Sequence, residues 1–121
     1  MADDISQFNV NDKEAWQWTM MIMQPGYITT DLFARALPAV AKKKNNAALK
    51  RIRFEPYHEG LSAQIMHIGS YAEEAPTIAN LHDYIVQCGN KLRGKHHEIY
   101  LNDPRKTQPT KLQTIIRQPF K

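Results

Sequence analysis

The amino-acid sequence predicts an α+β domain, in which a mainly antiparallel, twisted sheet carries its helices on one face. Short segments alternate apolar and polar residues, which is typical of half-buried strands. Two other segments repeat apolar residues at spacings of three and four, which is typical of amphipathic helices. The elements follow in the order strand, helix, strand, strand, helix, strand, strand. Residues 61–118 therefore form a complete strand-helix-strand-strand module, and the preceding elements form part of a second one.

The chain opens with a polar segment and an aromatic one. Residues 1–14 show no periodic pattern and are expected to form a flexible tail, which leaves residues 15–121 as a single domain. Residues 16–24 are rich in Trp and Met and end at a Pro-Gly turn. Because this segment is apolar on both faces near its end, it predicts an interior strand.

The first helix is predicted from a cap and one apolar face. Thr29 or Thr30 can cap its N-terminus, where Asp31 complements the helix dipole. The apolar face consists of Phe33, Leu37 and Val40. Pro38 cannot donate a backbone hydrogen bond and clashes with the preceding turn, so a kink or a restart of the helix is expected there.

The remaining elements follow the same logic. Residues 51–55 alternate as a strand, and residues 58–60 are expected to turn into the next strand, 61–68. Pro76 suits the first position of the second helix, and Gly89 suits its end. The apolar face of this helix consists of Ile78, Leu81, Ile85 and Cys88. The last two strands are predicted at residues 97–102 and 113–118.

Composition excludes several classes of protein. A chain of 121 residues with 42% hydrophobic residues can bury a modest core. No apolar run approaches the roughly 20 residues of a membrane span, and the polar start does not resemble a secretory signal, so a cytoplasmic protein without a membrane partner is expected. The net charge of +4 comes from scattered basic groups, which predicts no specific nucleic-acid binding. Cys88 is the only cysteine, so neither an intrachain disulfide nor a cysteine zinc site can form, and no cofactor is expected.

The segment 97–102 carries the strongest candidate site. Successive strand residues point to opposite faces, so Glu98 and Tyr100 share one face while Ile99 and Leu101 share the other. The apolar pair is expected to face the core, which leaves a carboxylate and a phenol together on the open face of the sheet. Such a pair suits the binding of an aromatic or cationic ligand, or the positioning of a water molecule.

Aromatic and histidine residues extend the candidate site. Trp16 and Trp18 are two apart, so their rings share one strand face. Further aromatic candidates for ligand contact are Phe54, Tyr57 and Tyr71. A metal site at His96 and His97 is rejected, because adjacent strand residues point to opposite faces. His67 shares a face with apolar residues and is expected to be a buried, hydrogen-bonded histidine.

Five stretches together resemble one known family. They are HHEIYLNDPRKT at 96–107, KLQTIIR at 111–117, WQWTMMIMQP at 16–25, the R-F-E segment within 50–57, and LSAQIMHIGSY at 61–71. In their order along the chain, these stretches are similar to those of the GyrI-like small-molecule-binding family, and to its stand-alone, cyclopropanoid-hydrolase-like branch. The resemblance implies two related modules that form one sheet, with the ligand cleft along their junction. The opening strand and helix of the first module have no counterpart here, so the chain resembles an N-terminally shortened member.

The resemblance also implies a function. Members of the family bind bulky hydrophobic, aromatic or cationic xenobiotics, and stand-alone members hydrolyse cyclopropane-bearing DNA-alkylating compounds inside an aromatic cage. In that mechanism Glu98 would orient or deprotonate the attacking water, Tyr100 would stabilise the developing oxyanion, and the tryptophans would stack on the substrate. Two alternatives stay open: a non-catalytic effector-binding or sequestering module, and a modulator of a protein target such as gyrase.

A homodimer is expected from the shortened sheet. A sheet that lacks its opening strand and helix exposes unpaired backbone groups, and two-fold pairing is the commonest way to cover them. Residues 16–24 are expected near that interface.

Overall fold

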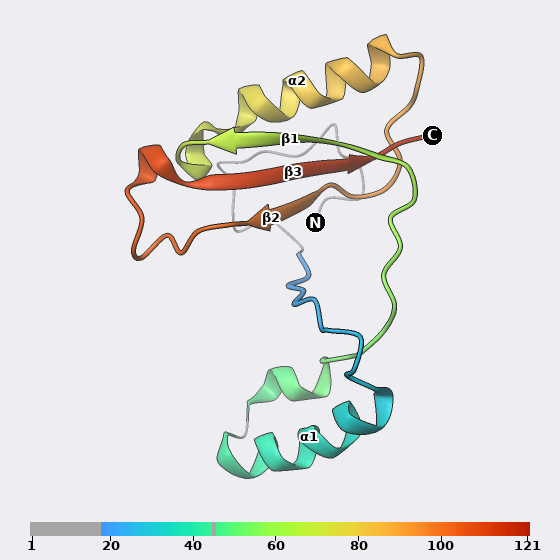
Figure 1. Cartoon of the computed structure of the whole chain (residues 1–121), viewed down its shortest axis with the longest axis vertical. Helices are drawn as coiled ribbons and strands as arrows, with labels where there is room; N and C mark the ends of the chain where they lie inside the picture. Colours follow the sequence, from blue (N-terminus) through green and yellow to red (C-terminus); the bar gives the residue numbers. More distant parts are fainter. Residues whose placement is uncertain (1–17, 45) are drawn as a thin grey trace. The chain divides into compact units, whose positions relative to one another are not determined.

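The computed structural model describes residues 18–44 and 46–121, which belong to two compact units (Figure 1). Among the described residues, the first unit comprises Glu59–Lys121 together with residues 18 and 19, and the second comprises Met20–His58. The described residues confirm the predicted α+β class: three antiparallel strands and two α-helices.

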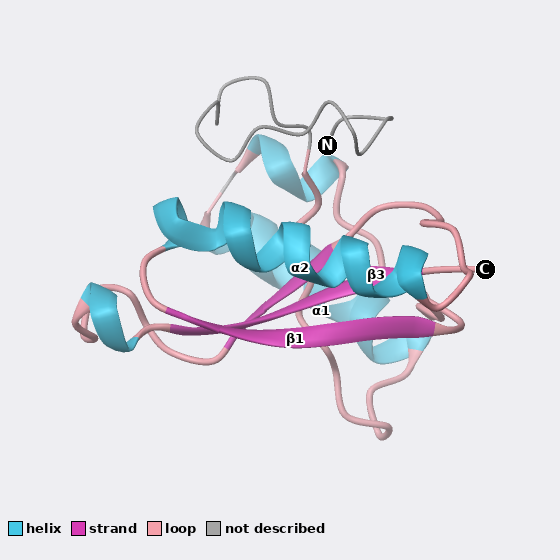
Figure 2. Cartoon of the chain, turned by 90° about the horizontal axis from the view of Figure 1, so that it is seen from above, coloured by secondary structure: helices cyan, strands magenta, loops and turns pink. Residues whose placement is uncertain are grey.

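The first unit is built around a three-stranded sheet. Strands β1 (Ser62–Ile68), β2 (His97–Tyr100) and β3 (Gln113–Pro119) lie in the order β1-β3-β2, and both pairings with β3 are antiparallel. Helix α2 (Glu74–Gln87) runs along one face of this sheet, and β2 is the edge strand farthest from it (Figures 1 and 2). The prediction of a strand-helix-strand-strand module is therefore confirmed.

The core of the first unit lies between α2 and the two strands nearest to it. Ile78, Leu81 and Ile85 recur along α2 at spacings of three and four and pack on Ile116 of β3. Ala63 and Ile65 of β1, with Leu92 and Phe120, complete this cluster. Helix α2 contacts mainly β1 and β3, so the core of this unit lies away from β2.

Turn residues set the ends of α2. Gly69, with φ of +139°, ends β1 and leads into the 3-10 helix η4 (Tyr71–Glu73). This turn brings the chain into the helix at Glu74, two residues before the predicted start at Pro76. Gly89, with φ of +84°, ends the helix as predicted, and the amide of Asn90 donates to the Ile85 carbonyl.

Cys88 does not join the apolar face of α2. The prediction of a buried thiol is wrong, because Cys88 follows the last helical residue and is exposed. The backbone turns away from the helical period at this point, so the spacing that placed Cys88 beside Ile85 no longer applies.

The sheet register corrects the predicted faces of β2. Glu98 lies opposite Ile116 and Tyr100 lies opposite Thr114, so both side chains are on the face that α2 covers. Ile99 lies opposite Ile115 on the other face. The prediction that Glu98 and Tyr100 lie on the face away from the helices is therefore wrong. Alternation separates two faces of a strand, but it does not state which face the helix covers.

The second unit holds the first helix and its aromatic contact. Helix α1 (Thr30–Lys43) begins as predicted, because the Thr29 hydroxyl oxygen accepts a hydrogen bond of 3.2 Å from the Leu32 amide. The 3-10 helix η3 (Ala47–Lys50) follows, and the rings of Phe33 and Phe54 stack at 5.6 Å. These contacts are local to the second unit.

Pro38 lies inside α1, which continues through it without a restart. The predicted restart is therefore wrong. Proline removes the hydrogen bond to the carbonyl of Ala34, but both residues are exposed, so water can satisfy that carbonyl.

Two predicted strands are not formed by the described residues. Residues 18–24 and 52–60 contain no strand, so there is no hairpin at 58–60. Residues 16 and 17 lie outside the described part. A strand is defined by its ladder of hydrogen bonds, and neither segment finds a pairing partner within the described residues.

The cap of α1 can be tested by substitution. Thr29→Ala is expected to destabilise the first turn by about 1 kcal/mol, because the Leu32 amide loses its acceptor. Faster hydrogen exchange of the first-turn amides would report this loss. Thr30→Ala is the matched control, since Thr30 is already inside the helix and has no capping bond to lose. Equal effects of the two substitutions would contradict the assigned cap.

Candidate functional site

The candidate site is a cluster of two carboxyl groups and two phenols on the helix side of β2. Glu98 and Tyr100 come from β2, Tyr71 comes from η4, and Glu74 is the first residue of α2. The Tyr100 hydroxyl donates a hydrogen bond of 3.0 Å to Oε2 of Glu98. The turn at Gly69 and the register of β2 thus bring together side chains that are up to 29 positions apart (71 to 100).

The two tyrosine rings form one wall of this site. Tyr71 and Tyr100 meet edge to face, with ring centroids 5.4 Å apart. The side chain of Tyr100 is 57% exposed, so a ligand can reach the ring. Burial first, and then the neighbouring carboxylates, raise the pKa of both phenols. Both hydroxyls therefore remain protonated at neutral pH and can donate hydrogen bonds.

Glu74 is the functional candidate that the sequence did not reveal. Its side chain is only 3% exposed. Burial, together with the hydrogen bond and charge of Glu98, raises the pKa of Glu74 to about 9. Glu74 therefore keeps its proton at neutral pH and can donate a hydrogen bond to Glu98. In the sequence, an acidic residue at a helix N-terminus indicates only a complement to the helix dipole.

Two histidines lie behind the carboxyl pair on the same side of the sheet. His96 is two residues before Glu98, and it interacts electrostatically with both Glu98 and His82 of α2. Burial lowers the pKa of His96 and of His82, while Gln118 hydrogen-bonds His82. Both imidazoles are therefore neutral at pH 7. The opposite-face expectation for His97 is confirmed, since it lies opposite Arg117 and its Nδ1 is 3.3 Å from Oε1 of Glu59.

The remaining predicted site residues are Trp16, Trp18, Phe54 and Tyr57. Trp16 lies outside the described residues, and Trp18 is exposed. Phe54 packs on Phe33 in the second unit, which also holds the exposed Tyr57. Of the predicted set, the structure brings together Glu98, Tyr100 and Tyr71.

His67 has the structural role that the sequence predicted. It is buried, Nδ1 is 2.8 Å from the Thr77 hydroxyl, and Nε2 is 2.8 Å from the Ser70 carbonyl. One ring nitrogen donates and the other accepts, so both are satisfied. This bridge ties β1 to η4 and α2, and so supports the turn that carries Tyr71.

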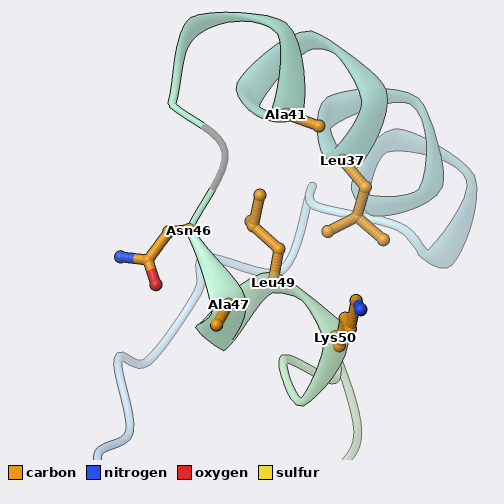
Figure 3. Close-up of a pocket in the computed structure, with 6 residues that line it drawn as sticks. All are labelled: Leu37, Ala41, Asn46, Ala47, Leu49 and Lys50. Atoms are coloured by element: carbon orange, nitrogen blue, oxygen red, sulfur yellow. The ribbon is translucent and has the colours of Figure 1, made fainter.

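The second unit contains a separate hollow between α1 and η3, with a volume of about 490 Å³ (Figure 3). The side chains of Leu37 and Leu49 lie in the space between the two helices, and the amide of Asn46 points away from it. The lining residues are Leu37, Ala41, Asn46, Ala47, Leu49 and Lys50. They include no acid and no aromatic ring, so the hollow offers none of the chemistry of the carboxyl cluster.

Residues 18–44 and 46–121 contain neither a cluster of metal ligands nor a helix that could span a membrane. Within these ranges, no three His, Cys, Asp or Glu side chains gather as metal ligands would. None of the helices in these ranges has the length and apolar character needed to cross a membrane.

The comparisons with known proteins decide the family. The sequence profile of the GyrI-like small molecule binding domain matches residues 15–121. The chain belongs to the GyrI-like family. As a GyrI-like domain it is a small-molecule-binding domain, which agrees with the exposed Tyr100 ring and the buried Glu74 carboxyl beside β2. No curated protein matches the chain.

Solved structures extend the GyrI-like assignment. An uncharacterized conserved protein from Listeria innocua is similar over 95% of this chain, with 36% identity and a TM-score of 0.85. Two hydrolases from the same organism are 35% and 34% identical over 81% of this chain, with TM-scores of 0.71 and 0.70. This chain covers 58%, 52% and 50% of those three proteins. It therefore spans little more than half the length of the structures that it matches.

Proposed function

We propose that this GyrI-like chain binds bulky hydrophobic, aromatic or cationic xenobiotics beside β2. The observation that supports this most directly is the Tyr100–Glu98 hydrogen bond, set between an accessible ring and a buried second carboxyl. Aromatic faces supply stacking area, and a buried carboxyl pair supplies a hydrogen-bonding and charged end. Trp16, Trp18, Phe54 and Tyr57 remain candidates for the other walls of an aromatic cage.

The same proposal includes hydrolysis of cyclopropane-bearing alkylating compounds. In a cyclopropane fused to a dienone, a water oxygen attacks the ring methylene, one ring C–C bond breaks, and its electrons reduce the dienone to a phenolate. Glu98 would take the proton of the attacking water, and a protonated phenol such as Tyr100 would stabilise the developing oxyanion. The products are a primary alcohol and a phenol, so one water is consumed. The hydrolase names of two Listeria innocua structures favour this chemistry.

The two carboxyls of the pair would have different roles, because one would hold a proton and the other would act as a base. The raised pKa of Glu74 keeps its proton in place at neutral pH, so Glu74 would act as a hydrogen-bond donor and Glu98 as the base. The Tyr100 hydroxyl donates to Oε2 of Glu98, and Oε1 of Glu98 is buried without a hydrogen-bond partner among the described residues. We therefore assign Glu98 as the base, Tyr100 as the oxyanion donor and Tyr71 as an aromatic contact.

Turnover of a cyclopropane-fused dienone probe tests the enzymatic part. The alcohol product is followed by mass spectrometry, and water labelled with ¹⁸O should place one label in the new alcohol. Saturable binding of the same probe without formation of the alcohol product would rule out the proposed hydrolase activity. It would favour a sequestering module. That module is the second candidate, because the chain spans only about half of the hydrolases that it matches.

We further propose that the chain forms a homodimer. Strand β2 is an edge strand in the described sheet, and residues 18–24 form no strand and are exposed, with side chains such as Met20, Ile22 and Met23 in solvent. Unpaired edges and exposed apolar segments associate readily. Light scattering across a dilution series should give twice the monomer mass at high concentration. A monomer at all concentrations would contradict this proposal.

A further inference from the structure

Strand β2 carries the proposed ligand site, although it has less support than the other two strands of the sheet. It pairs with β3 over 4 residues, whereas β1 pairs with β3 over 7. Helix α2 packs mainly on β1 and β3, and no described strand pairs with the other edge of β2. Contacts beyond the helix and the ladder therefore matter for the positions of Glu98 and Tyr100.

One such contact comes from a carboxylate on the face of the sheet opposite α2. Glu59 places Oε2 3.0 Å from Nη1 of Arg117 in β3, and Oε1 3.3 Å from Nδ1 of His97 in β2. The side chain of Glu59 is only 9% exposed. From β1, Oε1 of Gln64 accepts hydrogen bonds of 3.0 and 2.9 Å from Nε and Nη2 of Arg117. The sheet register places Gln64, Arg117 and His97 in one row, so Glu59 completes a polar connection across all three strands.

The backbone of Glu59 is fixed as well. Arg93 donates from Nη2 to the Glu59 carbonyl oxygen, and from Nε to the Phe120 carbonyl oxygen at 3.5 Å. Gly60 has a φ of +73°, and a Cβ at this position would lie 3.0 Å from Nη2 of Arg93. The glycine therefore lets Arg93 approach the backbone closely. A carboxylate that is covered in this way interacts with its partners more strongly than an exposed ion pair does.

We propose that Glu59 is a positioning residue for the ligand site and acts through His97. His97 and Glu98 are consecutive residues of β2, so their side chains lie on opposite faces and are joined by one planar peptide group. A contact that fixes His97 on one face therefore limits the movement of Glu98 on the other. Beyond the far end of β2, Oδ1 of Asn102 accepts a hydrogen bond of 2.6 Å from a backbone amide of β3, so the strand is held on both sides of the site. The inference rests on the proposed function, because it assumes that the side chains of β2 contact the ligand.

A double-substitution cycle in the full chain tests this role. Glu59→Gln leaves one acceptor oxygen for two partners, and His97→Gln removes the imidazole while the Glu59–Arg117 pair remains. Each substitution is expected to lower kcat for the cyclopropane-fused dienone probe about tenfold with little change in KM, because a small displacement of a base slows the reaction. If the probe binds without turnover, its affinity is measured instead. The double variant should lose no more than either single variant, since both substitutions break the same contact.

The matched control is Glu55→Gln. Glu55 is another carboxylate close in sequence, but its side chain is 56% exposed and pairs with Arg53. Its replacement should leave turnover and affinity unchanged, because neither residue contacts β2 through a printed bond of the sheet row. A loss equal to that of Glu59→Gln would mean that any carboxylate in this segment has the effect, and would overturn the specific role of Glu59.

Amide spectra of the chain without probe give a second readout. In Glu59→Gln the backbone amide signals of Glu98 and Tyr100 should shift, and the amides of β2 should exchange with solvent faster, while those of β1 keep their rates. Faster exchange in all three strands would mean that Glu59 only stabilises the fold, and would overturn the positioning role.

The outcomes separate this role from the binding function. Wild-type turnover in both single variants would overturn the positioning role and leave the ligand site in place. Additive losses in the double variant would also overturn it, because Glu59 would then not act through His97. If the wild-type chain neither binds nor converts the probe, the proposed function fails, and the amide spectra still decide whether Glu59 positions β2. If Glu59→Gln does not fold, His97→Gln decides alone: unchanged signals of Glu98 and Tyr100 would overturn the proposal.

Discussion

Replacement of Glu98 by Gln is expected to lower ligand affinity or turnover about tenfold or more. The amide keeps the size of the side chain and an oxygen that can accept from Tyr100, but it cannot take a proton from water or attract a cation. Because Glu98 lies on the face that α2 covers, the variant also removes one carboxyl from the pair with Glu74. Binding and turnover of the cyclopropane-fused probe give the measurement.

A stability measurement separates this loss from unfolding. Glu98→Gln keeps the size of the side chain and an oxygen that can accept from Tyr100, so the melting temperature should change little at neutral pH. The matched control is Glu73→Gln, which removes a carboxylate from the exposed residue next to Glu74 and should leave binding unchanged. A large loss of stability with unchanged binding would mean that Glu98 is a structural residue.

Replacement of Glu74 by Gln is expected to remove a pH dependence of stability. The folded-state pKa of Glu74, about 9, lies above its ordinary value of 4.5, so between these values the folded state holds a proton that the unfolded state has released. Stability conferred by this group is complete below pH 4.5 and is lost as pH rises toward 9. The loss approaches about 1.4 kcal/mol for each pH unit. In the Glu74→Gln variant, the new side-chain amide can donate to Glu98 at every pH and has no proton to lose.

Urea unfolding at several pH values tests this expectation. The pH range of this comparison should lie above 6.5, the ordinary pKa of histidine. Below that value, the lowered pKa values of His82 and His96 themselves reduce stability as the pH falls. In that range the wild-type chain should lose stability steadily, and Glu74→Gln should not. Glu73→Gln should keep the wild-type slope. An identical slope in all three proteins would show that Glu74 is ionised in the folded state.

The C-terminal module was predictable because its signals are local and agree with its tertiary contacts. The apolar face of α2, the glycines at 69 and 89, and the alternation in 113–118 all describe elements that the structure contains. The described residues 18–24 and 51–55 do not form the expected strands, for a different reason. Their alternation describes a surface that could pair, but pairing requires a neighbour, and a single segment holds no information about that neighbour.

The site was predictable only in part, for physical reasons that concern burial. The spacing of Glu98 and Tyr100 placed them on one face, and the hydrogen bond between them follows from that spacing. Which face α2 covers depends on the register with β3, and that register is a non-local property. Glu74 escaped notice because burial, and not residue type, distinguishes it from its exposed neighbour Glu73.

The open edge of β2 couples two properties of the chain that are usually studied apart. The amide of Leu101 donates to the Gln113 carbonyl of β3, and donors alternate along an antiparallel strand. The backbone amides of Glu98 and Tyr100 therefore point to the edge that no described strand pairs with, while their side chains belong to the proposed ligand site. Any chain that pairs with this edge holds the same two residues that a ligand contacts. A small molecule that favours one arrangement of these residues must therefore shift the equilibrium of association with that pairing chain. Association must in turn change the apparent affinity for the small molecule by the same factor.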